Sequence, residues 1–76
     1  MPIDDLTALG LKMREARKNK ELTQQELSDL SHVSVKQIAN IEKEKMNPSY
    51  LILGALAKIL RISLDTLINP DVSLDD

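Results

Sequence analysis

With 76 residues the chain can form one domain, and a core of this size buries only about 60% of the surface that the unfolded chain exposes. It contains no cysteine, which excludes a disulfide framework and a thiolate metal site and favours a reducing cytoplasm. No apolar run approaches the roughly 20 residues needed to span a bilayer, and the N-terminal MPIDDL lacks the basic region of a signal peptide. We therefore expect a cytoplasmic protein without a membrane partner.

The formal net charge of −2 conceals an uneven distribution along the chain. Residues 12–47 carry eight Lys or Arg against six Asp or Glu, whereas residues 1–11 and 48–76 each contribute −2. An excess of this size is more often a solvated face than a site for nucleic acid. The basic excess is therefore evidence for nucleic-acid binding only when other features of the sequence point the same way.

The first part of the chain predicts three helices. Thr23 precedes Glu26 by three residues, and Ser34 precedes Gln37 in the same way, so each pair can form a capping box at the start of a helix. We expect a second helix after Thr23 and a third over residues 34–43. A first, amphipathic helix from Leu6 to about Lys20 is predicted by apolar residues at steps of three and four, namely Leu6, Leu9, Met13 and Ala16.

Two further helices are predicted in the second part. Pro48 disfavours helical geometry in the residue before it, and Ser49 can cap a helix from Tyr50 to about Leu60. Gly54 should cost that helix about 1 kcal/mol relative to Ala, unless close backbone packing compensates. Ser63 can cap a short fifth helix, which Pro70 ends; the apolar positions of the two helices are Leu53, Leu56, Ala57, Leu60, Leu64, Leu67 and Ile68.

These elements predict an all-α protein with one domain. We expect an N-terminal arm over residues 1–5, a five-helix domain over residues 6–69, and a flexible acidic tail over residues 70–76. No strand alternation, internal repeat or long linker interrupts the domain.

The turn between the second and third helices contains only Ser31, His32 and Val33, which favours a sharp crossing of the two helices. Such a crossing is typical of the helix-turn-helix, whose second helix lies in the DNA major groove. We expect the inside of the corner to be packed by Leu27, Leu30, Val33, Ile38 and Ile41. The outside would then present Val35, Lys36, Ala39, Asn40 and Lys43.

The stretch LTQQELSDLSHVSVKQIANIEKEKMNPS, followed by LAKILRISLDTLI, resembles the Cro/repressor, or XRE-type, helix-turn-helix family. The resemblance extends from about Leu9 to Ile68, and the combined motifs at these separations are far more specific than any one of them. It implies a compact five-helix, lambda-repressor-like domain that binds double-stranded operator DNA, usually as a homodimer.

The resemblance also implies roles for individual residues. Gln24 would touch the phosphate backbone and a flanking base, and a segment after the third helix, with Lys43, Lys45 and Asn47, would contact phosphates. Base-facing positions fall on Ser34, Val35, Lys36 and Asn40. Their chemistry suits this role, because Lys can donate to guanine, Asn can pair with adenine, and Val can meet a thymine methyl group.

Arg17 and Glu42 stand where family members have a partly buried salt bridge, so we expect a structural ion pair. The sequence departs from the family at His32 and Glu44, which occupy positions where glycine is usual; His32 predicts a strained turn, and Glu44 adds negative charge near the expected phosphate contacts. A surplus of apolar side chains predicts either ordinary packing or a two-fold dimer surface, at Leu51, Ile52, Ile59 and Leu64.

Two functions remain open at this stage. The first is a sequence-specific transcription regulator, of repressor type; the second is an antitoxin-like or adaptor module that uses the fold to bind protein, which the acidic ends and Glu44 favour somewhat. An enzyme is not expected, because one histidine, no cysteine and no apolar carboxylate pair offer no nucleophile, general base or metal constellation. The sequence predicts no cofactor, no metal and no small-molecule ligand.

Overall fold

The structure is a computed structural model that describes residues 6–69, and all of its regular elements are helices. They are α1 (Leu6–Asn19), α2 (Gln24–Ser31), α3 (Val35–Glu42), α4 (Tyr50–Leu60) and α5 (Leu64–Ile68). The expected all-α class and five-helix architecture are confirmed within this range. The predicted arm (1–5) and tail (70–76) lie outside the described residues.

The helices begin where their capping residues predicted. Thr23 and Glu26 form a complete capping box at the start of α2, and Ser34 and Gln37 form one at the start of α3. Side chains of the two remaining capping residues accept a backbone N–H three residues on, at Ser49 for α4 and Ser63 for α5. Local hydrogen bonds between neighbouring residues therefore set the starts of four helices.

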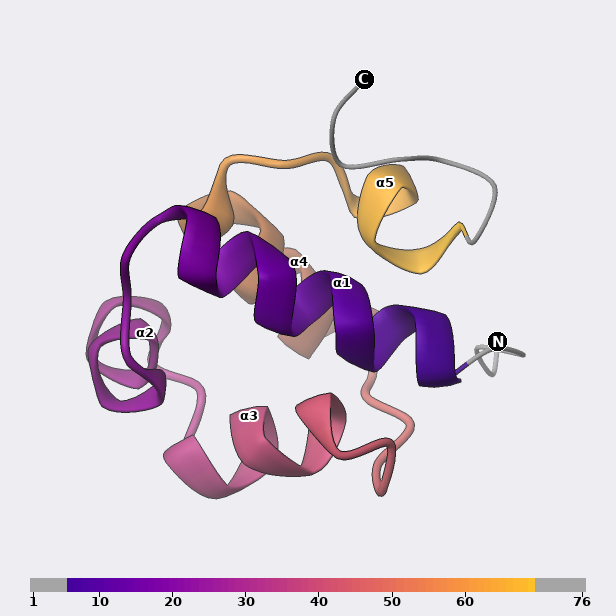
Figure 1. Cartoon of the computed structure of the whole chain (residues 1–76), viewed down its shortest axis with the longest axis horizontal. Coiled ribbons are helices and arrows are strands. Elements are labelled where there is room, and N and C mark those ends of the chain that lie inside the picture. Colours follow the sequence, from indigo (N-terminus) through magenta and orange to yellow (C-terminus); the bar gives the residue numbers. More distant parts are fainter. Residues whose placement is uncertain (1–5, 70–76) are drawn as a thin grey trace.

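Figure 1 shows α1 in front of α4 in this view, with the other helices around them. Helix α1 packs against α3 and α5, α2 packs against α3 and α4, and α4 packs against α5, so the core lies between these pairs of helices. Every helix contributes at least one of the large, fully buried side chains, which are Leu9, Met13, Leu27, Ile38, Ile41, Leu53, Leu56, Leu60 and Leu67. This arrangement leaves α2 and α3 along one edge of the molecule, as Figure 1 shows.

The prediction that Leu30 packs inside the corner was wrong, since Leu30 is 53% exposed. Ser31 takes the inward position one turn after Leu27. Its hydroxyl donates to the Leu27 carbonyl at 2.7 Å and accepts the Val33 N–H at 3.2 Å. Because the buried serine satisfies its own polar atoms, the helix can turn it inward and leave Leu30 in solvent.

The two glycines differ in a way that the sequence did not indicate. Nothing lies within 4 Å of a Cβ built on Gly54, so the close packing that could compensate for this glycine is absent. A Cβ on Gly10 would instead lie 2.9 Å from the Ile41 carbonyl oxygen and 3.0 Å from that of Glu42. Gly10 therefore permits the close approach of α1 and α3.

No helix among the described residues is both long and apolar enough to cross a membrane.

Candidate nucleic-acid interface

The corner between α2 and α3 is a tight turn centred on His32. Its backbone is left-handed, with φ of 63°, and its N–H donates to the Ser28 carbonyl at 2.9 Å. A non-glycine residue in this conformation is strained, as predicted. Val33 follows the turn and is buried beside Ile38, so the apolar side of the corner is firmly packed.

Helix α3 presents polar side chains on the side away from this packing. Ile38 and Ile41 are buried behind the helix, whereas Ser34 and Lys36 are exposed. Val35 and Asn40 are half-buried, so the protein covers them only in part. Of the expected base-facing residues, Ser34 and Lys36 are therefore fully accessible, and Val35 and Asn40 are accessible in part.

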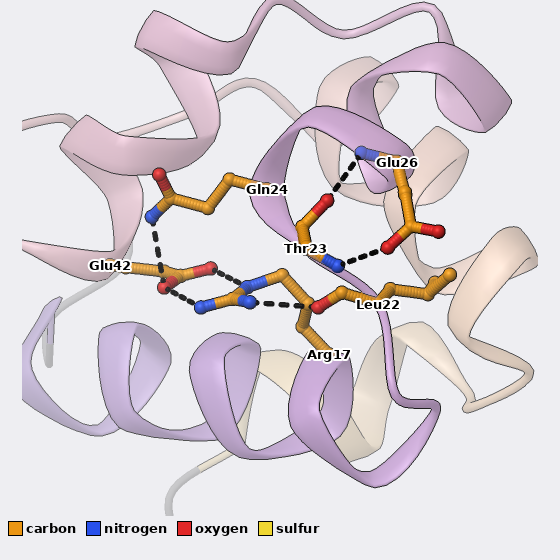
Figure 2. Close-up of polar contacts among 6 residues, drawn as sticks. All are labelled: Arg17, Leu22, Thr23, Gln24, Glu26 and Glu42. Atoms are coloured by element: carbon orange, nitrogen blue, oxygen red, sulfur yellow. Dashed lines mark hydrogen bonds and ion pairs between the residues drawn. The ribbon is translucent and has the colours of Figure 1, made fainter.

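Gln24, the first residue of α2, belongs to a hydrogen-bonded network that joins three helices (Figure 2). Arg17 donates from Nε to Glu42 Oε2 at 2.8 Å and from Nη2 to Glu42 Oε1 at 3.0 Å, so the expected ion pair is present and bidentate. Arg17 Nη1 also donates to the Leu22 carbonyl, and Gln24 Nε2 donates to Glu42 Oε1 at 3.3 Å. The network ties α1, the loop before α2, the start of α2 and the end of α3 together.

This ion pair is largely removed from water, with side-chain exposures of 11% for Arg17 and 5% for Glu42. Hydrogen bonding to Glu42 raises the pKa of Arg17 above its ordinary value, against the opposing effect of burial and with a further contribution from the carboxylate charge. The guanidinium therefore stays charged throughout the neutral range. It holds Glu42, which in turn fixes the amide of Gln24.

The segment after α3 carries the expected phosphate-contacting residues. Lys43, Lys45 and Asn47 are all exposed, and the Lys45 N–H donates to the Asn40 carbonyl at 2.8 Å. Glu44 lies between the two lysines with a left-handed φ of 65°, a conformation in keeping with the family's usual glycine. Its exposed carboxylate places negative charge beside the two cations.

The four residues proposed for a dimer surface are unequal. Leu51 is 86% exposed, whereas Ile52, Ile59 and Leu64 are partly buried and pack against the core. Leu51, Ile52 and Ile59 lie on one side of α4, because steps of seven and eight residues return to the same side of a helix. Three of the four apolar residues therefore contribute to core packing, and only Leu51 is largely exposed.

A family model described as helix-turn-helix matches residues 13–67, which is most of the chain. The chain belongs to the XRE-type helix-turn-helix family. This is a family of DNA-binding transcription regulators.

Two known proteins that are similar to this chain support the assignment. Among solved structures, the restriction-modification controller protein C.AhdI from Aeromonas hydrophila superposes with a TM-score of 0.79 and 32% identity, covering 83% of this chain and 96% of that one. The immunity repressor protein of Bacillus phage phi105 is 28% identical over 68 residues, which are 90% of this chain and 47% of the repressor. The chain thus spans about half the length of this curated relative.

Three features of this family member were missed by sequence reasoning. The bond from Gln24 to Glu42 joins positions 18 residues apart, and Arg14 lines a hollow together with Gln24 and Lys43. Lys12 donates from Nζ to the carbonyl oxygens of Thr66 and Asn69, which fastens the end of α5 to α1. Each of these three features depends on how the helices cross, and the periodicity of apolar residues does not indicate how helices cross.

Proposed function

We propose that this protein is a sequence-specific transcription regulator of repressor type, which places α3 in the major groove of double-stranded DNA. The observation that carries the proposal is the two-sided character of α3. Ile38 and Ile41 anchor its rear in the core, while Lys36 stands exposed at the front with Asn40 beside it. A helix held in this way can bring its polar face against base edges without disturbing the core.

The chemistry of the outer face suits bases and phosphates separately. Lys36 can donate to guanine O6 and N7, Asn40 can pair with adenine N6 and N7, and Val35 can contact a thymine methyl group, with Ser34 able to pair with several bases. Phosphate contacts would come from the flanking residues Gln24, Lys43, Lys45 and Asn47. These contacts would set the register of α3 on the duplex but would not select its sequence.

The names of the relatives agree with regulation of transcription, since one is a controller protein of a restriction-modification system and the other an immunity repressor. We extend the proposal to a homodimer formed through the face of α4 and α5 that includes Leu51, Ile52, Ile59 and Leu64. A two-fold dimer would read two half-sites about 34–36 Å apart, or a multiple of that distance.

Selection of bound duplexes from a random DNA pool tests binding, specificity and symmetry together. We expect a symmetric site to be enriched. Lys36→Ala and Asn40→Ala should each change the preferred base at one position of each half-site, at a cost of about 1–3 kcal/mol for the original site. Lys45→Ala is the matched control, because loss of a phosphate contact should weaken all sequences alike and reduce the salt dependence.

A protein that enriches no sequence but retains affinity at low salt would contradict sequence-specific reading. A protein that binds no duplex even at low salt would favour the alternative of an antitoxin-like or adaptor module, because a DNA reader retains nonspecific affinity under those conditions.

A further inference from the structure

A hollow of about 300 Å³ opens where α1, the start of α2 and the end of α3 meet. It is lined by Arg14 and Arg17 from α1, Gln24 from α2, and Glu42 and Lys43 at the end of α3. Two of these residues, Gln24 and Lys43, are among those we assign to phosphate contacts. The hollow therefore brings a residue that no sequence signal assigned, Arg14, beside the proposed DNA-binding face.

The charges that line the hollow leave it cationic. Arg17 neutralises Glu42 through the bidentate pair, and both carboxylate oxygens of Glu42 already accept hydrogen bonds. Arg14 and Lys43 are exposed, and neither forms a salt bridge with another residue in the described part of the chain. The lining thus carries three cations and one anion, a local charge of +2.

The lining of the hollow also includes a hydrogen-bond donor in a fixed position, the side-chain amide of Gln24. Gln24 Nε2 uses one N–H toward Glu42 Oε1, which fixes the orientation of the amide group. An amide nitrogen carries two hydrogens, so the second remains able to donate to an anion. The start of α2 contributes a partial positive charge at the same place.

We infer that this hollow binds one phosphate group of the DNA backbone, with Arg14 as a further contact residue. The inference rests on the proposed function, and it deepens that function by assigning a specific phosphate-binding site. A guanidinium group can donate two parallel N–H bonds to phosphate oxygens. Arg14 from α1, Gln24 from α2 and Lys43 from the end of α3 would then hold the same phosphate from three sides, which fixes the angle at which α3 enters the groove.

Fluorescence anisotropy can measure the affinity for a random-sequence duplex over a range of salt concentrations. This measurement tests the assignment without knowledge of the operator. Each lost phosphate contact reduces the magnitude of the negative slope of log K against log salt concentration by about 0.9, where K is the association constant. We expect Arg14→Gln to lower the slope by this amount and to weaken binding at low salt by about tenfold. Arg14→Lys keeps the charge and should retain most of the slope.

Lys18→Gln is the matched control, because it removes the same charge from the same exposed face one turn along α1. Lys18 does not line the hollow that contains Gln24. Equal losses for Lys18→Gln and Arg14→Gln would mean that only the overall charge matters, and this result would overturn the assignment. Thermal unfolding of each variant checks that the fold is retained.

Titration with inorganic phosphate, followed by the amide signals in nuclear magnetic resonance spectra, separates this inference from the proposed function. Shifts confined to Gln24 and Lys43, lost in Arg14→Gln and kept in Lys18→Gln, would support an anion site even if the unaltered protein bound no duplex. In that case the proposed function would fail while the hollow would remain a phosphate site. Shifts that are absent, or that are equal in both variants, would overturn the inference.

Discussion

At the scale of single residues, Gly10 lies where α1 closely approaches the backbone at the end of α3. An added Cβ would be 2.9 and 3.0 Å from two carbonyl oxygens, which cannot move as a flexible side chain can. We expect Gly10→Ala to lower the free energy of unfolding by about 1–3 kcal/mol, although alanine favours the helix by about 1 kcal/mol. Urea denaturation measures the change.

Gly54→Ala is the control for Gly10→Ala, because both glycines lie inside helices and only Gly10 has neighbours at the Cβ position. Alanine at Gly54 should raise the free energy of unfolding by about 0.5–1 kcal/mol through helix propensity. If the two substitutions had the same sign, the close approach of α1 and α3 would not be what Gly10 provides.

Glu44, like His32, has a left-handed backbone conformation that suits glycine. Its φ is 65° and its side chain is exposed, so Glu44→Gly removes strain without removing packing. We expect the free energy of unfolding to rise by about 0.5–1 kcal/mol, since the greater freedom of glycine in the unfolded chain offsets part of the gain. Glu44→Gln separates the effect of backbone strain from the effect of charge, because it removes the charge and keeps the strained backbone. Equal stability of Glu44→Gly and the unaltered protein would contradict this reading.

At the scale of elements, the ion pair between Arg17 and Glu42 connects α1 with α3. Removal of one partner leaves a buried charge without its counterion, so Arg17→Met should destabilise the fold by about 3–5 kcal/mol. Replacement of both residues by apolar ones leaves no buried charge. The double variant Arg17→Met with Glu42→Leu should therefore be more stable than Arg17→Met, as chemical denaturation of the double variant and of the single variants Arg17→Met and Glu42→Leu would show. Additive losses in the double variant would mean that the pair is not an energetic unit.

The starts of the helices could be predicted from sequence because their causes are local. Thr23 and Ser34 reach amides three residues away, and that distance along the chain is visible in the sequence itself. The outward position of Lys36 also followed from local periodicity once the second helix of the turn was identified. By contrast, the salt bridge between Arg17 and Glu42 could be predicted only from the family resemblance, because 25 residues separate the two side chains in the sequence.

Features that depend on helix crossing could not be predicted in this way. Leu30 was expected in the core because it is apolar, and the structure instead buries Ser31, whose hydroxyl is satisfied within its own helix and turn. Lys12 looks like an ordinary surface residue until α5 brings two carbonyl oxygens to it. Arg14 similarly gains its place beside Gln24 only through the packing of α1 against α3.

At the scale of the whole molecule, the homodimer that we propose would be formed through an exposed face of α4. Leu51 is 86% exposed on α4 beside the partly buried Ile52 and Ile59, and we propose this face for a two-fold contact. In a two-fold dimer each substitution changes the interface at two symmetry-related positions, one from each protomer. If each Leu51 buries its side chain in the dimer, Leu51→Glu should raise the dissociation constant by about a hundredfold or more, which sedimentation equilibrium measures.

Leu11→Glu provides the matched control for Leu51→Glu, because Leu11 is also strongly exposed, at 60%, but lies on α1 outside the proposed face. We expect this variant to remain a dimer and to bind a two-half-site duplex like the unaltered protein. Leu51→Glu should keep its affinity for an isolated half-site and lose the additional affinity for the complete site, since the second half-site gains from the first only when the two domains are joined. An unaltered protein that sediments as a monomer at high micromolar concentration would contradict the two-fold contact, and equal dissociation by both substitutions would place it on another face.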